Sequence, residues 1–372
     1  MEKLTQGILD SLISGAGLGA IAEKIDRGER LSRADGISLF NNPNLLALGA
    51  LADRVRERTH GRKAFFIRNQ HLNYSNICVN SCRFCAFSRK EGQEDAYRMD
   101  IDTIRRKITE RLDEPVSEIH IVGGLDPDLP WQYYLDMFAA VRELRPDVHI
   151  QAFTCVEIAH FADKFGKSVE EVLVELHDAG LGSIPGGGAE VFSGRIRKDL
   201  CPTKLGPEGW LEVAKTAHGL GIRSNSTMLY GHMETIAERV DHMIALREAQ
   251  DETGGFLTFI PLAFHSENTE LQGLPPTTGF DDLKTIAVGR LLLDNIPHIK
   301  SFWIMVGTKI AQLTLRFGAD DIDGTVVEEK ITHMAGARTS ECLSVEELLA
   351  LIRGAGCQPV ERDTVYNVIR EY

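Results

Sequence analysis

The sequence predicts an α/β protein whose core is a TIM-like (β/α)8 barrel, preceded by a helical cap at the N-terminus. Two observations predict this fold. Short apolar runs alternate with longer amphipathic segments along most of the chain, which is typical of parallel strands joined by helices. The length of 372 residues also suits a barrel, because barrels of about 250 residues or more commonly form a single unit.

The first 60 residues are mostly helical in pattern and come before the first strand. We therefore expect a cap over residues 1–60 and a barrel over residues 61–372, including a C-terminal segment that closes over the substrate. Strands are predicted near residues 64–75, 118–123, 148–154, 181–185, 223–230, 256–263, 299–306 and 321–326. Helices are predicted near residues 100–113, 130–144, 168–179, 207–219, 235–250, 281–295, 308–317 and 344–354.

Several of these helices carry recognisable ends. Ser168 and Ser344 each precede an apolar run with glutamate in the first turn, the pattern of a capping box. Gly180 and Gly221 follow other helical runs, where glycine commonly ends a helix. In a barrel of this kind the active site lies at the carboxyl ends of the strands, so polar motifs there deserve most weight.

The charge balance limits the kinds of partner. There are 41 basic and 54 acidic residues, a formal net charge of −13. This balance argues against a nucleic-acid binder, although a pocket can still be locally basic and bind a small anion. No secretion signal or run of 18 apolar residues is present, so we expect no membrane span and a cytoplasmic protein with reduced thiols.

Three of the seven cysteines fall within eight positions after the first predicted strand. Cys78, Cys82 and Cys85 have the spacing C-x3-C-x2-C. A structural zinc site needs four protein ligands, and no fourth cysteine or histidine lies at knuckle spacing. Three thiolates on a 4Fe–4S cube leave one iron open. S-adenosylmethionine (SAM) can bind that iron through its amino and carboxylate groups, and we expect a 5′-deoxyadenosyl radical to be formed from it.

The spacing resembles the signature of the radical SAM superfamily, and Phe87 then takes the place of the aromatic residue beside the adenine. The alternatives are a zinc-binding or structural cysteine loop, or coincidence. The remaining cysteines are predicted to be buried and inert; they are Cys155, Cys201, Cys342 and Cys357.

Two glycine-rich turns follow later strands. Gly123 and Gly124 end the second strand, where the backbone can approach the amino group of SAM; a simple tight turn is the alternative. The segment SIPGGGAEVF places Glu190 after three glycines, and we expect this carboxylate to accept hydrogen bonds from ribose hydroxyls. The alternative is a solvated loop carboxylate. A pyrophosphate loop is disfavoured because neither a G-x-G-x-x-G motif nor a Walker lysine is present.

The segment STMLYGHMET ends the fifth strand. Thr227 is a candidate for cofactor binding. His232 and Glu234 share a face with Tyr230 if the strand continues, and they are candidate catalytic groups. His232 is the preferred contact for a carboxylate of the substrate or of SAM, with a structural histidine as the alternative.

The segment FIPLAFHSENTEL follows the sixth strand and supplies two further catalytic candidates, His265 and Asn268. A carboxylate-bearing substrate would need cations near them, for which Arg89, Arg290 and Arg338 are candidates. Four polar groups near the end of the barrel could imitate a metal site, but we interpret them as substrate-hydroxyl or loop-structuring groups. They are Asp320, Asp321, Asp323 and His333.

Taken together, several segments resemble the aminodeoxyfutalosine synthases, the radical SAM family of the futalosine route to menaquinone. The resemblance runs from about residue 60 to Tyr372. It rests on the segments HLNYSNICVNSCRFCAFSR, SIPGGGAEVF, TMLYGHMET, DETGGF, FIPLAFHSENTEL and DGTVVEEKITHMAGA. Ser266 stands where this family commonly has proline.

The resemblance implies that the adenosyl radical adds to the double bond of 3-[(1-carboxyvinyl)oxy]benzoate, a dicarboxylate, and that SAM is consumed. Aminodeoxyfutalosine, methionine and CO2 or bicarbonate would be the products. A one-electron reductant of the flavodoxin or ferredoxin type would be a partner. The alternative is a hydrogen-abstracting relative, such as dehypoxanthine futalosine cyclase or deazaflavin (FO) synthase, and a non-enzymatic metal-binding protein is a third hypothesis.

Overall fold

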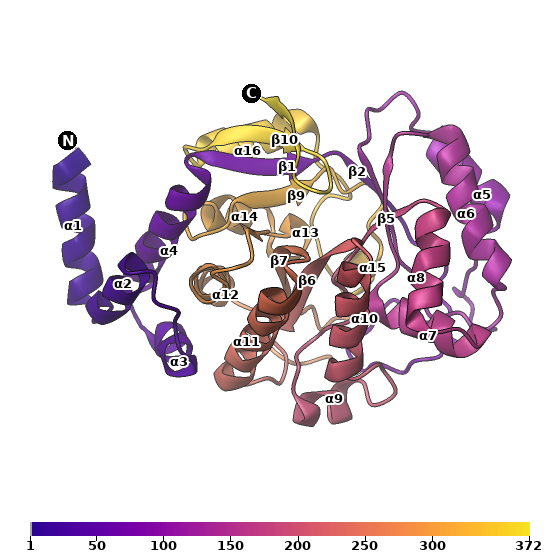
Figure 1. The fold of residues 1–372 in the computed structure, drawn as a ribbon, viewed down its shortest axis with the longest axis horizontal. Helices are drawn as coiled ribbons and strands as arrows, with labels where there is room; N and C mark the ends of the chain where they lie inside the picture. The colour runs from indigo at the N-terminus through magenta and orange to yellow at the C-terminus, as the bar shows by residue number, and fades with distance from the viewer. Residues whose placement is uncertain (1) are drawn as a thin grey trace.

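The computed structural model describes residues 2–372, with side chains from Gly7 onward. The chain begins with four helices that project to one side of the barrel (Figure 1). These are α1 (Glu2–Gly15), α2 (Gly19–Asp26), α3 (Arg33–Asn41) and α4 (Leu45–His60). The last of them packs on α12 (Gly279–Leu292) of the barrel. The expectation of a helical N-terminal segment before the first strand is confirmed.

The central element is a parallel sheet of seven strands in the order β2-β3-β4-β5-β6-β7-β8. Its strands are β2 (Asn69–Leu72), β3 (Glu118–Ile121), β4 (His149–Ala152), β5 (Leu181–Ile184), β6 (Arg223–Tyr230), β7 (Phe256–Ala263) and β8 (His298–Ile299). A second sheet has the order β11-β10-β1-β9 and consists of β1 (Lys63–Ile67), β9 (Asp321–Gly324), β10 (Gln358–Arg362) and β11 (Val368–Glu371).

The two sheets together close the barrel. β9 pairs with β1, and a bridge between Lys300 and Asp321 joins β9 to β8. Only Arg68 separates β1 from β2, so the ring continues directly into the seven-stranded sheet. The predicted TIM-like barrel is therefore confirmed, with its first strand shared between two sheets.

Helices on the outer face connect successive strands (Figure 1). They are α5 (Ile101–Thr109), α6 (Trp131–Leu144), α7 (Cys155–Phe165), α8 (Val169–Asp178), α9 (Gly194–Leu200), α10 (Pro207–Gly219), α11 (Ile236–Thr253), α12 and α14 (Thr308–Thr314). Ser168 forms the predicted capping box with Glu171. Ser344 does the same with Glu347 at the start of α16 (Val345–Gly354).

Two local expectations were wrong. Residues 299–306 do not form one strand, because β8 ends at Ile299 and the apolar run continues as the short helix α13 (Trp303–Val306). A short apolar run reads the same way in a buried strand and a buried helical turn. Helix α7 was also missed; it begins directly after β4 with a capping box between Thr154 and Glu157.

The outer layer of the barrel has an apolar core, with buried aliphatic and aromatic side chains between the sheet and the helices. The barrel interior is different. Barrel interiors are usually filled by branched aliphatic residues, but here buried polar residues such as His71, Gln151 and Lys300 point inward and line a cavity. Among the described residues, no helix is long and apolar enough to cross a membrane.

Candidate active site

A cavity of about 340 Å³ opens at the carboxyl ends of the barrel strands and extends down into the barrel. The loop after β2 contributes Cys78, Cys82 and Cys85 to its mouth, and the inward face of the strands forms its lower part. Apolar side chains such as Leu262 and Phe302 line the wall in between. This position is the one at which barrel enzymes carry their active sites.

The cysteine loop is held in shape by backbone contacts and by one lysine. Cys78 N donates to the carbonyl oxygen of Arg89 at 3.0 Å, and Cys85 N donates to that of Cys82 at 3.1 Å. The ammonium group of Lys90 donates to three successive carbonyls, those of Cys78, Val79 and Asn80, at 2.8, 3.1 and 2.9 Å. Sequence reasoning missed this lysine, because a charged residue beside a loop normally indicates only solvent exposure.

Burial changes the acidity of the thiols. It raises the pKa of Cys82 to about 12, and it also raises the pKa of Cys85. Such thiols stay protonated at neutral pH unless a metal binds them, since metal coordination deprotonates a thiol. Phe87 is buried beside the loop and lines the same cavity.

The turn after β3 packs directly on the cysteine loop. A Cβ at Gly123 would lie 2.7 Å from the ring of Tyr74, and a Cβ at Gly124 would lie 2.2 Å from the carbonyl oxygen of Ile77. Both glycines also line the cavity. The immediate reason for glycine here is therefore the close approach of the two loops.

Glu157, which sequence reasoning missed, holds this turn from below. Its carboxylate accepts from Gly123 N at 3.0 Å and from the Tyr74 hydroxyl at 2.9 Å, and it also closes the capping box with Thr154. Burial raises the pKa of Glu157 to about 7. The sequence signal that could have found it is Thr-x-x-Glu directly after a strand.

The three-glycine segment also packs tightly against strand β6 and helix α7. A Cβ at Gly186 would lie 2.7 Å from the carbonyl oxygen of Asn225, and one at Gly188 would lie 2.4 Å from a methyl of Val156. The turn delivers Glu190 to the cavity lining, with its backbone at φ 51°. Thr227 lies opposite, and its hydroxyl donates to the carbonyl oxygen of Gly186 at 2.5 Å.

Glu190 is paired with a buried cation. Lys204 Nζ lies 2.6 Å from Glu190 Oε1 and 5.3 Å from the centre of the Phe84 ring. Burial alone would lower the pKa of Lys204, but the attraction of Glu190 raises it instead. The alternative of a solvated loop carboxylate at Glu190 is therefore wrong, because the residue is only 6% exposed.

Two predicted catalytic residues lie outside the cavity lining. β6 ends at Tyr230, and Gly231 turns the chain at φ 90°, so the alternation expected beyond the strand does not occur. The ring nitrogens of His232 contact the carbonyl of Leu229 at 3.1 Å and the amide of Met233 at 2.7 Å. Glu234 accepts from Gly231 N and from Arg239 at 2.6 and 2.7 Å. Both side chains thus shape the loop after β6.

His265 lines the cavity, and its Nε2 lies 2.9 Å from the carbonyl oxygen of Met305. Asn268 does not line it. Its side chain is exposed, and it donates to the carbonyl of Met334 at 3.0 Å. Asn268 therefore ties the loop after β7 to the segment of residues 329–339, which contributes Glu329, Ile331, Thr332 and Ala335 to the cavity lining.

The arginines considered as substrate partners are all occupied elsewhere. Arg89 pairs with Asp95, Arg290 pairs with Asp320, and Arg338 is exposed beside Glu267. Within the described chain, the cations that line the cavity are Lys204 and Lys300. Sequence reasoning missed both.

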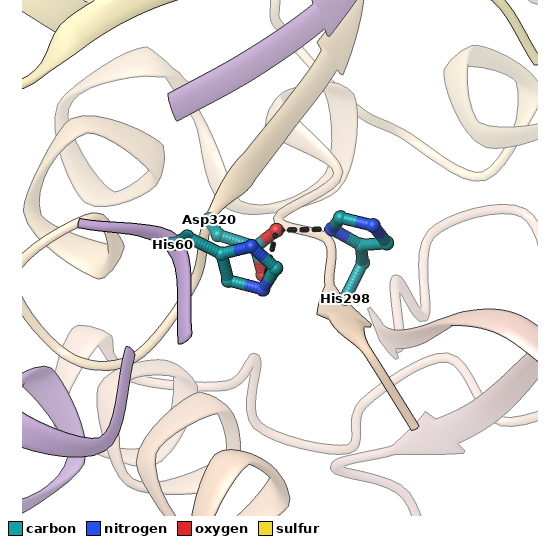
Figure 2. A group of neighbouring side chains, drawn as sticks. All are labelled: His60, His298 and Asp320. Atoms are coloured by element: carbon teal, nitrogen blue, oxygen red, sulfur yellow. Dashed lines mark hydrogen bonds and ion pairs between the residues drawn. The ribbon is translucent and has the colours of Figure 1, made fainter. Parts of the chain in front are cut away.

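Of the three aspartates considered near the end of the barrel, Asp320, Asp321 and Asp323, only Asp323 lines the cavity. Asp320 lies below the barrel, where its carboxylate contacts His298 Nδ1 at 2.5 Å and His60 Nε2 at 3.5 Å (Figure 2). The other carboxylate oxygen accepts from Arg290 and from Ile299 N. These three side chains have the residue types of a metal site. Because Arg290 already neutralises Asp320, we interpret the group as a structural charge network.

Comparison with known proteins identifies the family of the chain. Residues 72–246 match the model of the radical SAM superfamily, and residues 253–371 match the CofH/MqnC C-terminal region. An aminodeoxyfutalosine synthase from Thermus thermophilus is 47% identical over 94% of this chain and 95% of its own length. A second one, from Streptomyces coelicolor, is 45% identical over 95% of this chain and 94% of its own length. The chain belongs to the aminodeoxyfutalosine synthase family of radical SAM enzymes.

Other enzymes are also similar to this chain. A 5-amino-6-(D-ribitylamino)uracil–L-tyrosine 4-hydroxyphenyl transferase from Archaeoglobus fulgidus is 41% identical over 86% of this chain and 92% of its own length. Methylornithine synthase superposes with a TM-score of 0.72 at 17% identity, covering 91% of this chain and 96% of that one. The latter comparison shows the shared radical SAM barrel fold.

Radical SAM enzymes use a 4Fe–4S cluster and SAM, and the residues of this family member fit that cofactor. The cavity lining contains three of the seven cysteines, and the other four lie outside it. Three of these four are buried as predicted, but the prediction was wrong for Cys342, which is exposed. A structural zinc site needs four protein ligands, whereas three thiolates on a 4Fe–4S cube leave one iron open for SAM.

Proposed function

We propose that the chain adds the 5′-deoxyadenosyl group of SAM to 3-[(1-carboxyvinyl)oxy]benzoate. The products are 6-amino-6-deoxyfutalosine, methionine and CO2 or bicarbonate, in menaquinone biosynthesis. The single observation that carries this proposal is the identity of 47% over 94% of the chain with an aminodeoxyfutalosine synthase. The cavity supports it, because it joins a cysteine loop to a buried chamber large enough for a small aromatic molecule.

A 4Fe–4S cluster held by Cys78, Cys82 and Cys85 would supply the electron that cleaves SAM to methionine and a 5′-deoxyadenosyl radical. Addition of this radical to the terminal vinyl carbon forms a C–C bond and leaves the unpaired electron on the acceptor. Migration of the aryl group from oxygen to carbon breaks the aryl C–O bond, forms the aryl C–C bond and leaves the unpaired electron on the oxygen. Cleavage of the C–C bond to the enolpyruvyl carboxylate then forms the ketone and releases CO2, and one electron would return to the electron donor. The overall conversion is redox-neutral.

The residues around the mouth of the cavity would hold SAM. In this proposal Phe87 packs against the adenine, and Glu190 accepts hydrogen bonds from the ribose. The backbone of Gly123 and Gly124 approaches the amino group. Thr227 lies beside them and fixes the triple-glycine turn through its bond to Gly186.

The acceptor would lie deeper, with His265 as a direct contact from the wall. His232, Glu234 and Asn268 act as positioning residues in this proposal, because their hydrogen bonds are made to the loops that surround the cavity. The wall of apolar residues and the segment 329–339 exclude water and competing hydrogen donors from the radical.

The proposal extends to the organisation of the chain. Residues 1–60 form a helical cap, and residues 61–372 form the catalytic barrel with a C-terminal segment that closes over the substrate.

A one-electron reductant of the flavodoxin or ferredoxin type supplies the electron, and no nucleic acid takes part. The protein works in the cytoplasm, where thiols and the cluster stay reduced.

The test is a product assay. Protein reconstituted anaerobically with iron and sulfide receives SAM, dithionite and the acceptor, and the products are separated by liquid chromatography and mass spectrometry. We expect aminodeoxyfutalosine and methionine in equal amounts. Free 5′-deoxyadenosine together with unchanged acceptor would contradict the proposal.

A hydrogen-abstracting activity is the second candidate. The match to the CofH/MqnC C-terminal region and the 41% identity with the uracil–tyrosine transferase favour it. Incubation with dehypoxanthine futalosine distinguishes the two candidates. Formation of one 5′-deoxyadenosine for each dehypoxanthine futalosine consumed would support hydrogen abstraction.

A further inference from the structure

The floor of the cavity is formed by buried polar side chains from five strands or strand ends. His71, His120 and Gln151 are in register on β2, β3 and β4, and Lys300 and Asp323 close the ring from β8 and β9. The rings of His71 and His120 are stacked, with their centres 4.5 Å apart. Buried polar groups are costly unless they are hydrogen-bonded. Polar side chains on the cavity floor that lack hydrogen-bond partners therefore indicate a binding site for a polar ligand.

Several of these groups have unused hydrogen-bonding capacity. The imidazole of His71 is buried, and its Nε2 has no hydrogen-bond partner among the described residues. Lys300 Nζ carries three donors, but within the described chain its only hydrogen bond is to Asp323 Oδ1, at 3.2 Å. The side chain of Lys300 is 9% exposed, and Lys300 lines the cavity.

The charges of the cavity leave one cation available for a substrate. Lys204 at the mouth lies 2.6 Å from Glu190 and beside the cysteine loop. Lys300 at the floor has the longer ion pair, at 3.2 Å. A dicarboxylate that enters a buried cavity needs a cation or several donors for each carboxylate.

We propose that Lys300, assisted by His71, binds the benzoate carboxylate of the acceptor. This inference rests on the proposed function. The vinyl carbon that receives the adenosyl group must face the mouth, where the cysteine loop lies. In 3-[(1-carboxyvinyl)oxy]benzoate the benzoate carboxylate is at the opposite end of the molecule, so it reaches the floor. Binding at the floor thereby fixes how deeply the acceptor enters the cavity and where its vinyl group lies.

The neighbours of Lys300 fit this role. Burial lowers the pKa of His71, so its imidazole is neutral near pH 7 and can donate one N–H without adding charge. Asp323 is the ion-pair partner of Lys300, Glu118 also lines the cavity, and burial raises the pKa of Asp323. A carboxylate ligand therefore replaces or shares the long contact between Lys300 and Asp323.

The experiment pairs a protein variant with a substrate variant. Wild type and Lys300→Met are each assayed with the natural acceptor and with its benzamide analogue, in which the benzoate carboxylate is a neutral carboxamide. We expect wild type to prefer the carboxylate by about 10- to 100-fold in kcat/KM, the usual size of a charge-assisted hydrogen bond. Lys300→Met should discriminate less than about threefold.

Two further variants control for structural damage. Lys309→Met removes an exposed lysine from α14 and should keep the wild-type preference. The double variant with Lys300→Met and Asp323→Asn removes the unpaired acid, so that a folded floor without charge is available if the single variant is unstable. SAM affinity and the cluster absorbance should be unchanged in every variant.

The outcomes distinguish a failure of the proposed function from a failure of the assignment of Lys300. If wild type makes no aminodeoxyfutalosine from the natural acceptor, the proposed function fails, and this inference fails with it. If wild type makes the product but Lys300→Met or the double variant keeps the full preference for the carboxylate, only the assignment of Lys300 is overturned.

Discussion

Gly124 and Ile77 are in direct contact between two different loops: a Cβ on Gly124 would come within 2.2 Å of the carbonyl oxygen of Ile77. Gly124 N also donates to the carbonyl oxygen of Ser75 at 2.7 Å. Ile77 precedes the first cysteine of the loop directly. The turn after β3 and the cysteine loop are therefore packed as one unit, and the turn sets the position of Cys78.

The first prediction concerns this contact. Gly124→Ala should displace the backbone at Ile77 and Cys78, because a backbone carbonyl cannot move aside as a flexible side chain can. We expect less than half of the wild-type iron content and 400-nm absorbance after anaerobic reconstitution. Gly219→Ala on α10 is the matched control, since a Cβ there meets nothing within 4 Å. Equal cluster content in both variants would refute the packing argument.

The second prediction concerns the cysteines. Cys82→Ala should abolish SAM cleavage, because two thiolates hold a 4Fe–4S cluster poorly, whereas Cys342→Ala removes an exposed thiol outside the cavity and should be nearly silent. The measurement is the rate of methionine formation from SAM under dithionite. If Cys82→Ala cleaved SAM at a rate comparable to wild type, the assignment of the cluster ligands would be wrong.

The third prediction concerns the pair of Glu190 and Lys204. Lys204→Met leaves Glu190 buried without its cation, and truncating one partner of a buried charge pair is costly. Glu190→Gln keeps the size of the side chain but weakens its acceptance of ribose hydroxyls. We expect both variants to weaken SAM binding by roughly tenfold or more, measured by equilibrium dialysis of reconstituted protein. Glu170→Gln, at an exposed position on α8, should bind like wild type.

The fourth prediction concerns the pH dependence of the segment 329–339. The hydrogen bond with Glu329 raises the pKa of His333 to about 9. A raised pKa means that the folded segment holds the proton more tightly than the unfolded chain, whose histidine pKa is near 6.5. The contribution of His333 to order in this segment is therefore complete below about pH 6.5 and is lost as the pH rises through about 9.

Amide hydrogen exchange measures this loss. At each pH, wild type is compared with His333→Gln, so that intrinsic exchange rates cancel. The wild-type segment should be better protected at pH 7, and the difference should disappear by about pH 10. His177→Gln, at an exposed position on α8, should match wild type throughout. A difference between wild type and His333→Gln that stays constant from pH 7 to 10 would show that the charge of His333 is not the cause.

Features that depend on neighbouring residues could be predicted from the sequence. The cysteine spacing, the glycine turns and the capping serines each act within a few positions of the chain, and the structure places Phe87, Gly123, Gly124, Glu190 and Thr227 around one cavity. The alternation of apolar runs and amphipathic segments likewise predicted the barrel, because the hydrophobic periods of strands and helices differ clearly.

Features that depend on contacts between residues far apart in the sequence could not be predicted. Lys300 and His71 line the same cavity only because the barrel closes between β8, β9 and the first strand. The position of His232 outside the cavity lining could not be predicted, because a strand pattern does not tell where the strand ends. Gly231 turns the chain away, and the backbone of the same loop satisfies both ring nitrogens.

The most direct test of the account follows the adenosyl carbon itself. Reconstituted protein is incubated with the acceptor and with SAM that carries 13C at the 5′-carbon of the adenosyl group. The account predicts that aminodeoxyfutalosine appears with the label at the newly bonded carbon, in an amount equal to the methionine released. Recovery of the label only in 5′-deoxyadenosine, with the acceptor unchanged, would contradict it.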